Sequence, residues 1–572
     1  MSYRPTYPLD WTYWIWLWGR ERGESGAGYA VVGLHFRCLL LGSIHHTDRN
    51  VCGHPQWTAV LLRPSTTRGR TYGSTWHLCQ TGAQCRSPNS SRWRSKVAIV
   101  LVICIIITIV CLAVVQHKKK TPSKYGVVAD AGSSHTGIYV YQWLADKENG
   151  TGMVQQVMEC TAEDPLTEFE RNPNSTLHCL KVAVKSVPSI KRAETTISLG
   201  ATAGMRLLSL KNESMANHII QLIHKTLSTT VFDMRDVSIL DGADEGAFGW
   251  ITVNYLTGKL VELNTWTNSF TLPEGMDTFG ALDLGGASTQ ISYVPLERST
   301  NDTLVFHLYG RNYNVYTHSY LCFGQNQALL KLLANLSEEI TGDGLDVPCF
   351  QKGYAFNMTG SKLFGSPCTQ QHNTDTKEHN RTISLVGLGD PGACSSSIAN
   401  LFNTLDFHQE SQPPFTCNFM AFSAFYYTMS FFNLSEGSSS PEQLNETVWT
   451  FCALPWHEVK ARWSVPEKYL SNYCFAGFYV LHLLTLGYRF NKSTWSNIKF
   501  VNKLEGTLGK GRAGWTLGYM LNLTNLLPEE APVNPIHLVP FAVVISLLVL
   551  GLFVLIVLLL FKSEICFPSR NF

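Results

Sequence analysis

The chain has 572 residues, which is more than one ordinary domain contains. Its composition, with 45% hydrophobic and 15% charged residues, is that of a folded protein rather than a disordered one. The formal net charge of +2 indicates no polyanion-binding surface, so nucleic-acid binding is not predicted.

Residues 1–96 form an N-terminal extension to which we assign no structure or function. The first 90 of them are rich in Trp, Arg and Gly and show no hydrophobic periodicity. They also contain Cys38, Cys52, Cys79 and Cys85. A disordered tail or an unusual transcript start is favoured over a metal-binding or membrane-surface role.

Two apolar runs without a charge are long enough to cross a bilayer. They are residues 97–115, in which only Thr108 is clearly polar, and residues 541–561. A buried core helix is the alternative, but the length of each run favours a transmembrane helix. Residues 562–572 then form a short tail. Basic residues flank the first run on both sides, so they leave its orientation open.

The region between the two runs carries two signs of an extracellular or lumenal location. It contains eleven N-glycosylation acceptor sites, at Asn149, Asn174, Asn212, Asn301, Asn335, Asn357, Asn380, Asn433, Asn445, Asn491 and Asn522. It also contains nine of the sixteen cysteines, Cys160, Cys179, Cys322, Cys349, Cys368, Cys394, Cys417, Cys452 and Cys474. None has the spacing of a zinc site, so disulfides in an oxidising compartment are predicted. Both ends of the chain would then be cytosolic.

Two short segments in this region are near-copies of each other. Residues 130–136 (DAGSSHT) and 283–289 (DLGGAST) both read D-x-G-[SG]-x-[HS]-T. Each lies between two strand-like runs, so each predicts a β-hairpin with an acidic residue at the end of its first strand. The repeat predicts two related half-domains that face one another.

The residue types in these segments predict phosphate binding. Glycines let backbone N–H groups approach an anion, and the hydroxyls add donors. The two aspartates would repel a phosphate, so a divalent cation is expected to bridge them. The alternative is two unrelated tight turns, but the similarity extends over both flanks.

The rest of the region alternates between strand-like and helix-like runs. Residues 197–206 read as a strand that enters a helix, and residues 215–227 and 327–336 read as helices. A short strand at 238–240 precedes an acidic, glycine-rich turn, and a helix is expected from near Ala247. This alternation predicts α/β layers, with ligands bound at strand ends.

Six segments, in this order, resemble the ecto-nucleoside triphosphate diphosphohydrolase (apyrase) family of cell-surface nucleotidases. They are DAGSSHT (130–136), LGATAGMR (199–206), DGADEGAFGWITVNY (241–255), ALDLGGASTQ (281–290), and the late pair AFSAFYYT (421–428) and WTLGYMLNLTN (515–525). The resemblance covers about residues 124–527 and both apolar runs. Residues 307–324 resemble the surface members with two spans, among them the liver-type eighth member, and the subtype stays open.

This resemblance implies an α/β protein with an actin-like, hexokinase-like fold. Two lobes, built from duplicated ribonuclease H-like domains, would surround a cleft. Lobe I would comprise residues 116–240, completed by 505–536, and lobe II residues 241–504. One transmembrane helix would lie at each end, which gives a two-pass plasma-membrane protein with an extracellular, N-glycosylated catalytic domain. Homo-oligomers are implied by the resemblance alone.

The resemblance also implies roles for individual residues. Glu245 matches the catalytic base, and Ser288 and Gln290 match residues that position the attacking water. Phosphate-binding positions are Ser133, Ser134, His135, Gly285, Gly286, Ala287 and Ser288. Tyr427 and Tyr473 match the pair that stacks the nucleobase. Asp130, Thr202, Asp283 and Trp515 match positions around a Ca²⁺ or Mg²⁺ ion that is held largely through water. Extracellular nucleotides would be the substrates, with no preference for ATP or ADP evident.

The residues around Glu245 allow other interpretations. Glu245 lies in an apparent glycine-flanked turn, where it could serve as a base or, alternatively, favour a helix dipole. Its neighbour Asp244 is expected to point elsewhere. Arg206 is expected to pair with a nearby carboxylate rather than contact phosphate, and His135 is a secondary candidate.

The chain departs from the family pattern in three places. Asp241 and Ala243 stand where relatives carry other residues, at positions that vary. Residues 404–411 are short and lack a cysteine pair that is usual in the family. By resemblance, the disulfides are Cys160–Cys179, Cys322–Cys368, Cys349–Cys394 and Cys452–Cys474. Cys417 is left over, either free or available for intermolecular pairing.

Hydrolysis of extracellular nucleoside tri- and diphosphates is therefore the leading hypothesis. A kinase of the same superfamily would need cytosolic ATP, which the sequons and cysteines oppose. A third interpretation is a catalytically weakened surface protein that only binds nucleotides. Glu245 argues against it, because a protein that only binds needs no catalytic base.

Overall fold

The computed structural model describes residues 89–117, 121–264, 269–275, 277–296, 303–337, 344–369, 380–402, 407, 412–436 and 439–561. Residues 1–88, Asn301 and nearly all of the shortened segment 404–411 therefore lie outside the described residues.

A five-stranded sheet is formed by the first part of the described chain. Its strand order is β3 (Gln155–Ala162), β2 (Thr136–Leu144), β1 (Ser123–Ala131), β4 (Thr196–Ala201) and β5 (Asp233–Ile239). The first three strands are antiparallel, whereas β4 and β5 run parallel to β1. The turn between β1 and β2 is the first of the two repeated segments.

A six-stranded sheet repeats this arrangement. Its order is β10 (Thr303–Leu308), β11 (Arg311–Leu321), β9 (Ser288–Tyr293), β8 (Gly280–Leu284), β15 (Phe419–Ser423) and β16 (Ile498–Phe500). Again a hairpin, β8–β9, has antiparallel strands on one side, here β11 and the additional β10, and two parallel strands on the other. Both predicted hairpins are thus confirmed, and they occupy equivalent places in two sheets of the same order.

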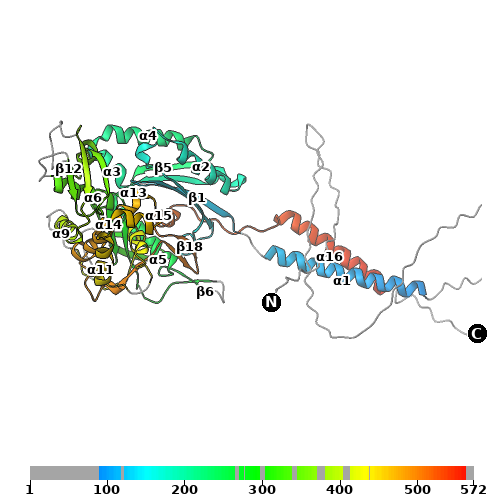
Figure 1. The fold of residues 1–572 in the computed structure, drawn as a ribbon. Helices are drawn as coiled ribbons and strands as arrows, with labels where there is room; N and C mark the ends of the chain where they lie inside the picture. Colours follow the sequence, from blue (N-terminus) through cyan, green and yellow to red (C-terminus); the bar gives the residue numbers. More distant parts are fainter. Residues whose placement is uncertain are drawn as a thin grey trace, which may run out of the picture. The chain divides into compact units, whose positions relative to one another are not determined.

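Helices cover both sheets and fill the layer between them. Helices α2 (Asn174–Ser186), α3 (Ala203–Lys211) and α4 (Glu213–Ser228) belong to the apolar core on one face of the five-stranded sheet (Figure 1). On its other face, α5 (Gly242–Leu256) and α15 (Trp515–Thr524) pack against each other and share a core with residues of both sheets. Glu245 lies in the first turn of α5 and Trp515 at the start of α15, whereas Ser288 and Gln290 lie on β9.

The largest core lies on the outer face of the six-stranded sheet. It is built from α6 (Gln325–Ser337), α9 (Pro391–Leu401), α10 (Ala424–Phe431), α11 (Pro441–Cys452), α12 (Trp456–Arg462), α14 (Tyr473–His482) and the three-stranded sheet β12 (Gly344–Val347), β14 (Thr382–Gly387) and β13 (Ala355–Thr359). The shorter elements are α7 (Gly360–Phe364), α13 (Glu467–Leu470), and the hairpins β6–β7 (Glu262–Asn264, Ser269–Thr271) and β17–β18 (Lys503–Gly506, Gly509–Arg512).

The predicted helices at 215–227 and 327–336 correspond to α4 and α6, but the prediction for α5 was wrong at its start. Helix α5 begins at Gly242 rather than near Ala247. The Asp241 side chain accepts a hydrogen bond from the backbone N–H of Ala243 (2.8 Å), which caps the helix there. The two glycines that suggested a turn therefore lie inside a helix.

Four disulfides connect the described cysteines. They are Cys160–Cys179, Cys322–Cys368, Cys349–Cys394 and Cys452–Cys474, the same pairs that the family resemblance implies. Cys417 is half-buried and unpaired.

Helices α1 (Asn89–His117) and α16 (Leu538–Phe561) are long and apolar enough to cross a membrane. They extend beyond the predicted runs 97–115 and 541–561 and lie side by side (Figure 1). The Gln116 amide of α1 bonds to the segment just before α16, because it both donates to and accepts from the Ile536 backbone (3.0 and 3.3 Å).

Candidate active site

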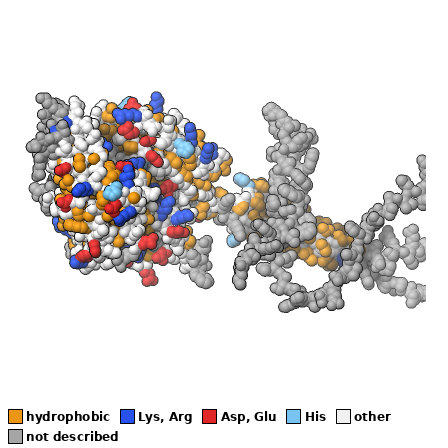
Figure 2. All heavy atoms as spheres, viewed as in Figure 1, with side chains coloured by type: hydrophobic (Ala, Val, Ile, Leu, Met, Phe, Trp, Pro, Cys, Tyr) orange, Lys and Arg blue, Asp and Glu red, His pale blue; other side chains and the backbone are white. Residues whose placement is uncertain are grey.

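The two repeated turns present unpaired backbone donors. In the first turn the N–H groups of Ser133, Ser134 and His135 donate to no other described residue, and in the second the same holds for Gly286 and Ala287. Backbone N–H groups that lack a protein acceptor at a glycine turn are suited to an anion such as a phosphate. The charged side chains do not mark such a site on the face of the protein seen in Figure 2, where basic and acidic side chains are interspersed.

The second turn is held from behind by α6. The carbonyl of Gly285 accepts from Gln325 N–H (2.9 Å), and that of Gly286 accepts from Asn326 N–H (2.9 Å) and Gln327 N–H (3.1 Å). The first N–H groups of a helix have no intrahelical partner, so these bonds satisfy them. The turn's carbonyls are thus turned towards α6.

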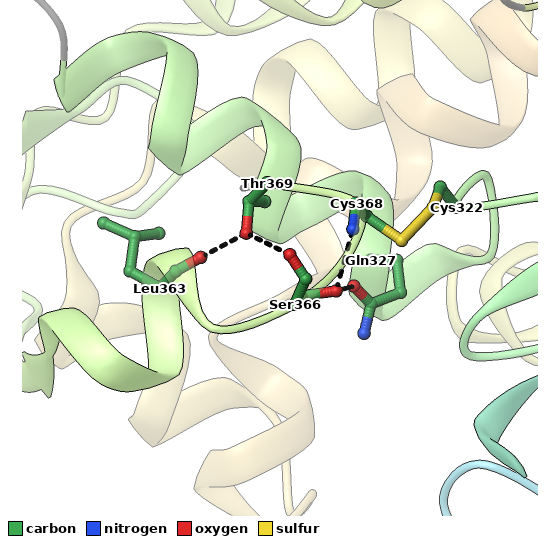
Figure 3. The surroundings of a disulfide bond; sticks show 6 residues. All are labelled: Cys322, Gln327, Leu363, Ser366, Cys368 and Thr369. Atoms are coloured by element: carbon green, nitrogen blue, oxygen red, sulfur yellow. Dashed lines mark hydrogen bonds between the residues drawn. A yellow bond between two sulfur atoms is a disulfide. The ribbon is translucent and has the colours of Figure 1, made fainter. Parts of the chain in front are cut away.

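A disulfide fixes this end of α6 (Figure 3). Cys322 donates its N–H to the Ala287 carbonyl (2.9 Å) and is bonded to Cys368. The Ser366 hydroxyl donates to Gln327 of α6 (2.6 Å) and accepts from the Cys368 N–H (3.2 Å). The second turn, α6 and the disulfide loop therefore form one supported unit.

The two turns approach each other closely. A Cβ atom added at Gly286 would lie 2.6 Å from Ser133 Oγ, and one added at Gly204 would lie 2.9 Å from Ser133 Cα. Gly204 lies in the first turn of α3, so α3 supports the first turn much as α6 supports the second. Phosphate groups bound to one turn would therefore lie beside the other.

Glu245 lies in the first turn of α5, and its position depends on glycines. A Cβ at Gly242 would lie 2.4 Å from Ser319 Oγ, and a Cβ at Gly246 would lie 2.7 Å from Ser292 Oγ and Thr317 Oγ1. The two glycines let the helix start approach the β9–β11 face of the six-stranded sheet. Asp244 instead lines a separate cavity with Asp236 and Tyr519, as expected of a side chain that points elsewhere.

A buried hydrogen-bond network surrounds the Glu245 carboxylate. Arg206 Nη2 donates to Glu245 Oε2 (2.8 Å) and to Ser288 Oγ (3.0 Å). Gln290 Nε2 donates to Glu245 Oε2 (3.2 Å) and to Ser288 Oγ (2.7 Å). The structure thus brings together the predicted base and the two predicted water-positioning residues, and Arg206 pairs with a carboxylate as expected.

Burial governs the charge state of the carboxylates. It raises the pKa of Glu245, which is 8% exposed, and the charge of Arg206 opposes this rise. Burial, followed by the negative charge of Glu245, raises the pKa of Asp130 and that of Asp283 to about 7 each. Neither aspartate forms an ion pair with another described residue. Arg512 lies near enough to Asp130 for its charge to oppose the rise in that carboxyl's pKa. Two largely buried carboxylates that form no ion pair among the described residues are electrostatically suited to a divalent cation.

The other predicted cation-site residues lie near these aspartates. Thr202 is buried and donates its backbone N–H to the Ala131 carbonyl beside Asp130 (3.0 Å). The Trp515 indole N–H has no hydrogen-bond partner among the described residues, and it lies near enough to Asp130 to lower the pKa of that carboxyl. No group of three His, Cys, Asp or Glu side chains in the described chain could hold a metal ion.

The two predicted nucleobase-binding tyrosines lie on α10 and α14. Tyr427 is 45% exposed, and its ring packs edge-on to Tyr426. Tyr473 stacks on Phe431, with ring centroids 3.6 Å apart, and it is close enough to Tyr427 for that phenol to help raise its pKa. Burial, with a contribution from Arg512, lowers the pKa of His135.

The sequence analysis missed two contributors. Ser319 of β11 accepts from Gln290 Nε2 (3.0 Å), and Arg512 of β18 donates to the Tyr427 hydroxyl (2.8 Å). Neither lies in a recognisable motif. Ser319 reaches the site because β11 pairs with β9, and Arg512 reaches it through side-chain bonds to Glu159 and Tyr427, and the sequence offers no local signal for either.

The comparisons agree with this geometry. A sequence model of the GDA1/CD39 (nucleoside phosphatase) family matches residues 116–536. The chain is 40% identical over 492 residues to rat ectonucleoside triphosphate diphosphohydrolase 1, a match that covers 82% of this chain and 95% of the rat protein. It is 45% identical to the bovine type 1 protein, a match that covers 76% of this chain and 88% of the bovine protein. It is 44% identical to the mouse type 8 protein, a match that covers 72% of this chain and 85% of the mouse protein. Type 1 and type 8 proteins are thus similar to the chain to nearly the same degree.

A solved structure shows the same fold. The crystal structure of nucleoside triphosphate hydrolases from Neospora caninum covers 72% of this chain and 94% of its own, with a TM-score of 0.53 at 15% identity.

Proposed function

The chain belongs to the GDA1/CD39 nucleoside phosphatase family, and from this membership and the site geometry we propose that it hydrolyses nucleoside tri- and diphosphates outside the cell. The substrates are nucleotides such as ATP, ADP, UTP and UDP, and the products are nucleoside monophosphate and inorganic phosphate. The observation that carries the proposal is the buried Glu245, fixed by Arg206 beside two turns with unpaired backbone donors.

Each group of site residues has its own role in the proposed hydrolysis. The free N–H groups of the two turns bind the polyphosphate and orient its terminal phosphorus. Ser288 and Gln290 hold a water in line with the bond to be broken, and Glu245 accepts a proton from that water as its oxygen attacks. The bond between the terminal phosphorus and the bridging oxygen breaks, and the leaving group departs with that oxygen. Glu245 then releases its proton to solvent.

A divalent cation completes this site. Asp130 and Asp283, with Thr202 and Trp515 nearby, would hold Ca²⁺ or Mg²⁺ largely through water. When bound, the ion supplies positive charge to the phosphate oxygens.

In this proposal the site lies outside the cell. The candidate spans α1 and α16 both cross the plasma membrane, so the two ends of the chain lie on one side and the region between the helices on the other. The sequons and disulfides of that region support the extracellular side for it and the cytosolic side for the ends. None of the ten described sequon asparagines is buried, so each is accessible to glycosylation. The two sheets form the cores of two lobes, lobe I at 116–240 with 505–536 and lobe II at 241–504. Homo-oligomers of this two-span protein form part of the proposal.

Phosphate release by intact cells tests this function. Cells that express the chain are given external ATP or ADP with Ca²⁺, and wild type is compared with Glu245→Gln at matched surface expression. We expect release from both nucleotides, abolished by chelation and by Glu245→Gln. The adjacent Asp244→Asn serves as the matched control and retains activity. No release from well-exposed wild type would refute the proposed enzyme.

A further inference from the structure

Arg512 connects β3 of the five-stranded sheet to helix α10 through two contacts that the proposed mechanism does not use. It lies at the end of β18, in a short hairpin that precedes Trp515 by three residues. Its backbone N–H donates to Gln156 Oε1 on β3 (3.2 Å). Its guanidinium then forms two bonds to two different parts of the protein.

One of these bonds anchors Arg512 to the five-stranded sheet. Its Nη1 donates to Glu159 Oε1 on β3 (2.7 Å), and both side chains are about three-quarters buried, with exposures of 24% and 21%. Because Arg512 and then Lys503 attract its charge, the pKa of Glu159 is lowered despite partial burial. A charge-assisted bond between partly buried groups holds the guanidinium in a defined place.

The other bond reaches the half of the protein that contains the six-stranded sheet. Arg512 Nη2 donates to the Tyr427 hydroxyl (2.8 Å), and Tyr427 lies on α10, directly after β15. The hydroxyl is therefore fixed while the ring, 45% exposed, keeps an open face. An exposed aromatic face beside an anion-binding site is suited to stacking a planar base.

We propose that Arg512 is a positioning residue that holds Tyr427 in the orientation in which its ring stacks the purine or pyrimidine base of the substrate. The inference rests on the proposed function, because it assumes a nucleotide whose phosphates lie at the two turns. Glu159 fixes Arg512, and Arg512 fixes the Tyr427 hydroxyl. The orientation of the Tyr427 ring on α10 is thereby set by a carboxylate on β3 of the five-stranded sheet.

The test separates base binding from phosphate binding. We compare wild type with Arg512→Ala, Tyr427→Phe and the double variant, and measure kcat and KM for ATP and UTP. Inorganic tripolyphosphate, which has no base, serves as a competing ligand. The matched control is Lys503→Ala, which removes one positive charge beside the same Glu159 (3.4 Å) from a side chain that is 65% exposed.

The expected result is a rise in KM with little change in kcat. Loss of one hydrogen bond of this kind corresponds to about a three- to tenfold weaker interaction. Arg512→Ala and Tyr427→Phe should each raise KM by that factor, and the double variant should be no worse than either single variant. The inhibition constant of tripolyphosphate should stay unchanged, and Lys503→Ala should behave as wild type.

Three outcomes would overturn the inference. Weaker tripolyphosphate inhibition in Arg512→Ala would show that Arg512 acts on the phosphates through its charge. Additive effects of the two single variants would show that they do not act through one bond. Unchanged KM values in an active enzyme would show that the contact has no role in binding. If wild type itself does not hydrolyse ATP, the proposed function fails instead, and the two failures are thereby distinguished.

Discussion

At the scale of single residues, the site depends on how Glu245 is kept charged and oriented. Burial raises its pKa, and the Arg206 guanidinium at 2.8 Å opposes that rise. A base must be deprotonated at working pH and must hold one orientation, and Arg206 contributes to both. Since 39 residues separate Arg206 from Glu245, the sequence predicts that the arginine pairs with a carboxylate but not with which one.

Removal of the Arg206 charge is expected to shift the pH dependence of activity. In Arg206→Gln the pKa of Glu245 rises further, so the acid limb of the kcat/KM profile moves to higher pH. Arg206→Lys keeps the charge and leaves the limb near its wild-type position, although kcat falls because the Ser288 contact is lost. We expect kcat of the glutamine variant to fall by about 10²-fold. Coincident acid limbs in all three proteins would contradict this role.

The two buried aspartates predict a pH-dependent stability in the absence of cation. Asp130 and Asp283 have a pKa of about 7 each in the folded protein, well above that of an unfolded aspartate. The folded state therefore binds more protons, and their contribution to stability is lost as the pH rises from 4 through 7.

Calorimetry with a chelator checks this expectation. The Tm of chelated wild type should fall between pH 5 and pH 8, and Ca²⁺ should restore it at pH 8. Asp283→Asn should show a smaller fall, because one titrating group is gone. A chelated wild type whose Tm falls no more over this range than that of Asp283→Asn would refute it.

At the scale of elements, the repeat of the D-x-G segments is the sequence feature that predicts the secondary structure best. It predicts two hairpins, and both occur at equivalent places in the two sheets. The sequence was misleading at α5, where Gly242 and Gly246 suggest a turn. Glycine is unfavourable in a helix, but here close contacts with Ser319, Ser292 and Thr317 leave no room for a side chain, so packing overrides propensity. Such contacts cannot be read from a local pattern.

Gly204 offers a test of how α3 supports the first turn. In Gly204→Ala the new Cβ meets the Ser133 backbone, at a distance of 2.9 Å for an undisturbed structure, so the turn must shift. Overpacking of this kind costs about 1–3 kcal/mol, and we expect kcat/KM for ATP to fall by about tenfold or more.

A matched glycine provides the control for this substitution. Gly344 lies in β12, where an added Cβ meets nothing within 4 Å, so Gly344→Ala should keep wild-type activity. Full activity of Gly204→Ala would show that the first turn tolerates displacement.

At the scale of the whole molecule, two sheets of one strand order meet around α5 and α15. This arrangement brings residues far apart in sequence, such as Asp130, Glu245 and Trp515, to one place. The alternation of strand-like and helix-like runs predicts the α/β class, and the motifs in their order carry the family resemblance, but the contacts across the two sheets depend on tertiary packing. The Arg512 bridge is the clearest example, since nothing in the hairpin sequence marks it.

The exposure of the sequons predicts glycosylation on the extracellular side. N-glycosidase treatment of the chain from mammalian cells should increase its gel mobility. The variant Asn149→Gln removes one exposed site after β2, and before treatment it should run lower on the gel than wild type by about the mass of one glycan. No mobility change upon treatment would contradict an extracellular location of the region between the two spans.

The most direct test of the account is whether Glu245 acts in the reaction rather than in binding. Purified Glu245→Gln and wild type are compared in single-turnover hydrolysis of ATP with Ca²⁺, and in calorimetric binding of a non-hydrolysable ATP analogue. The account predicts an affinity within about threefold of wild type and a hydrolysis rate lower by about 10²–10⁴-fold, the contribution of a general base. Near wild-type turnover, or a loss of binding as large as the loss of rate, would contradict it.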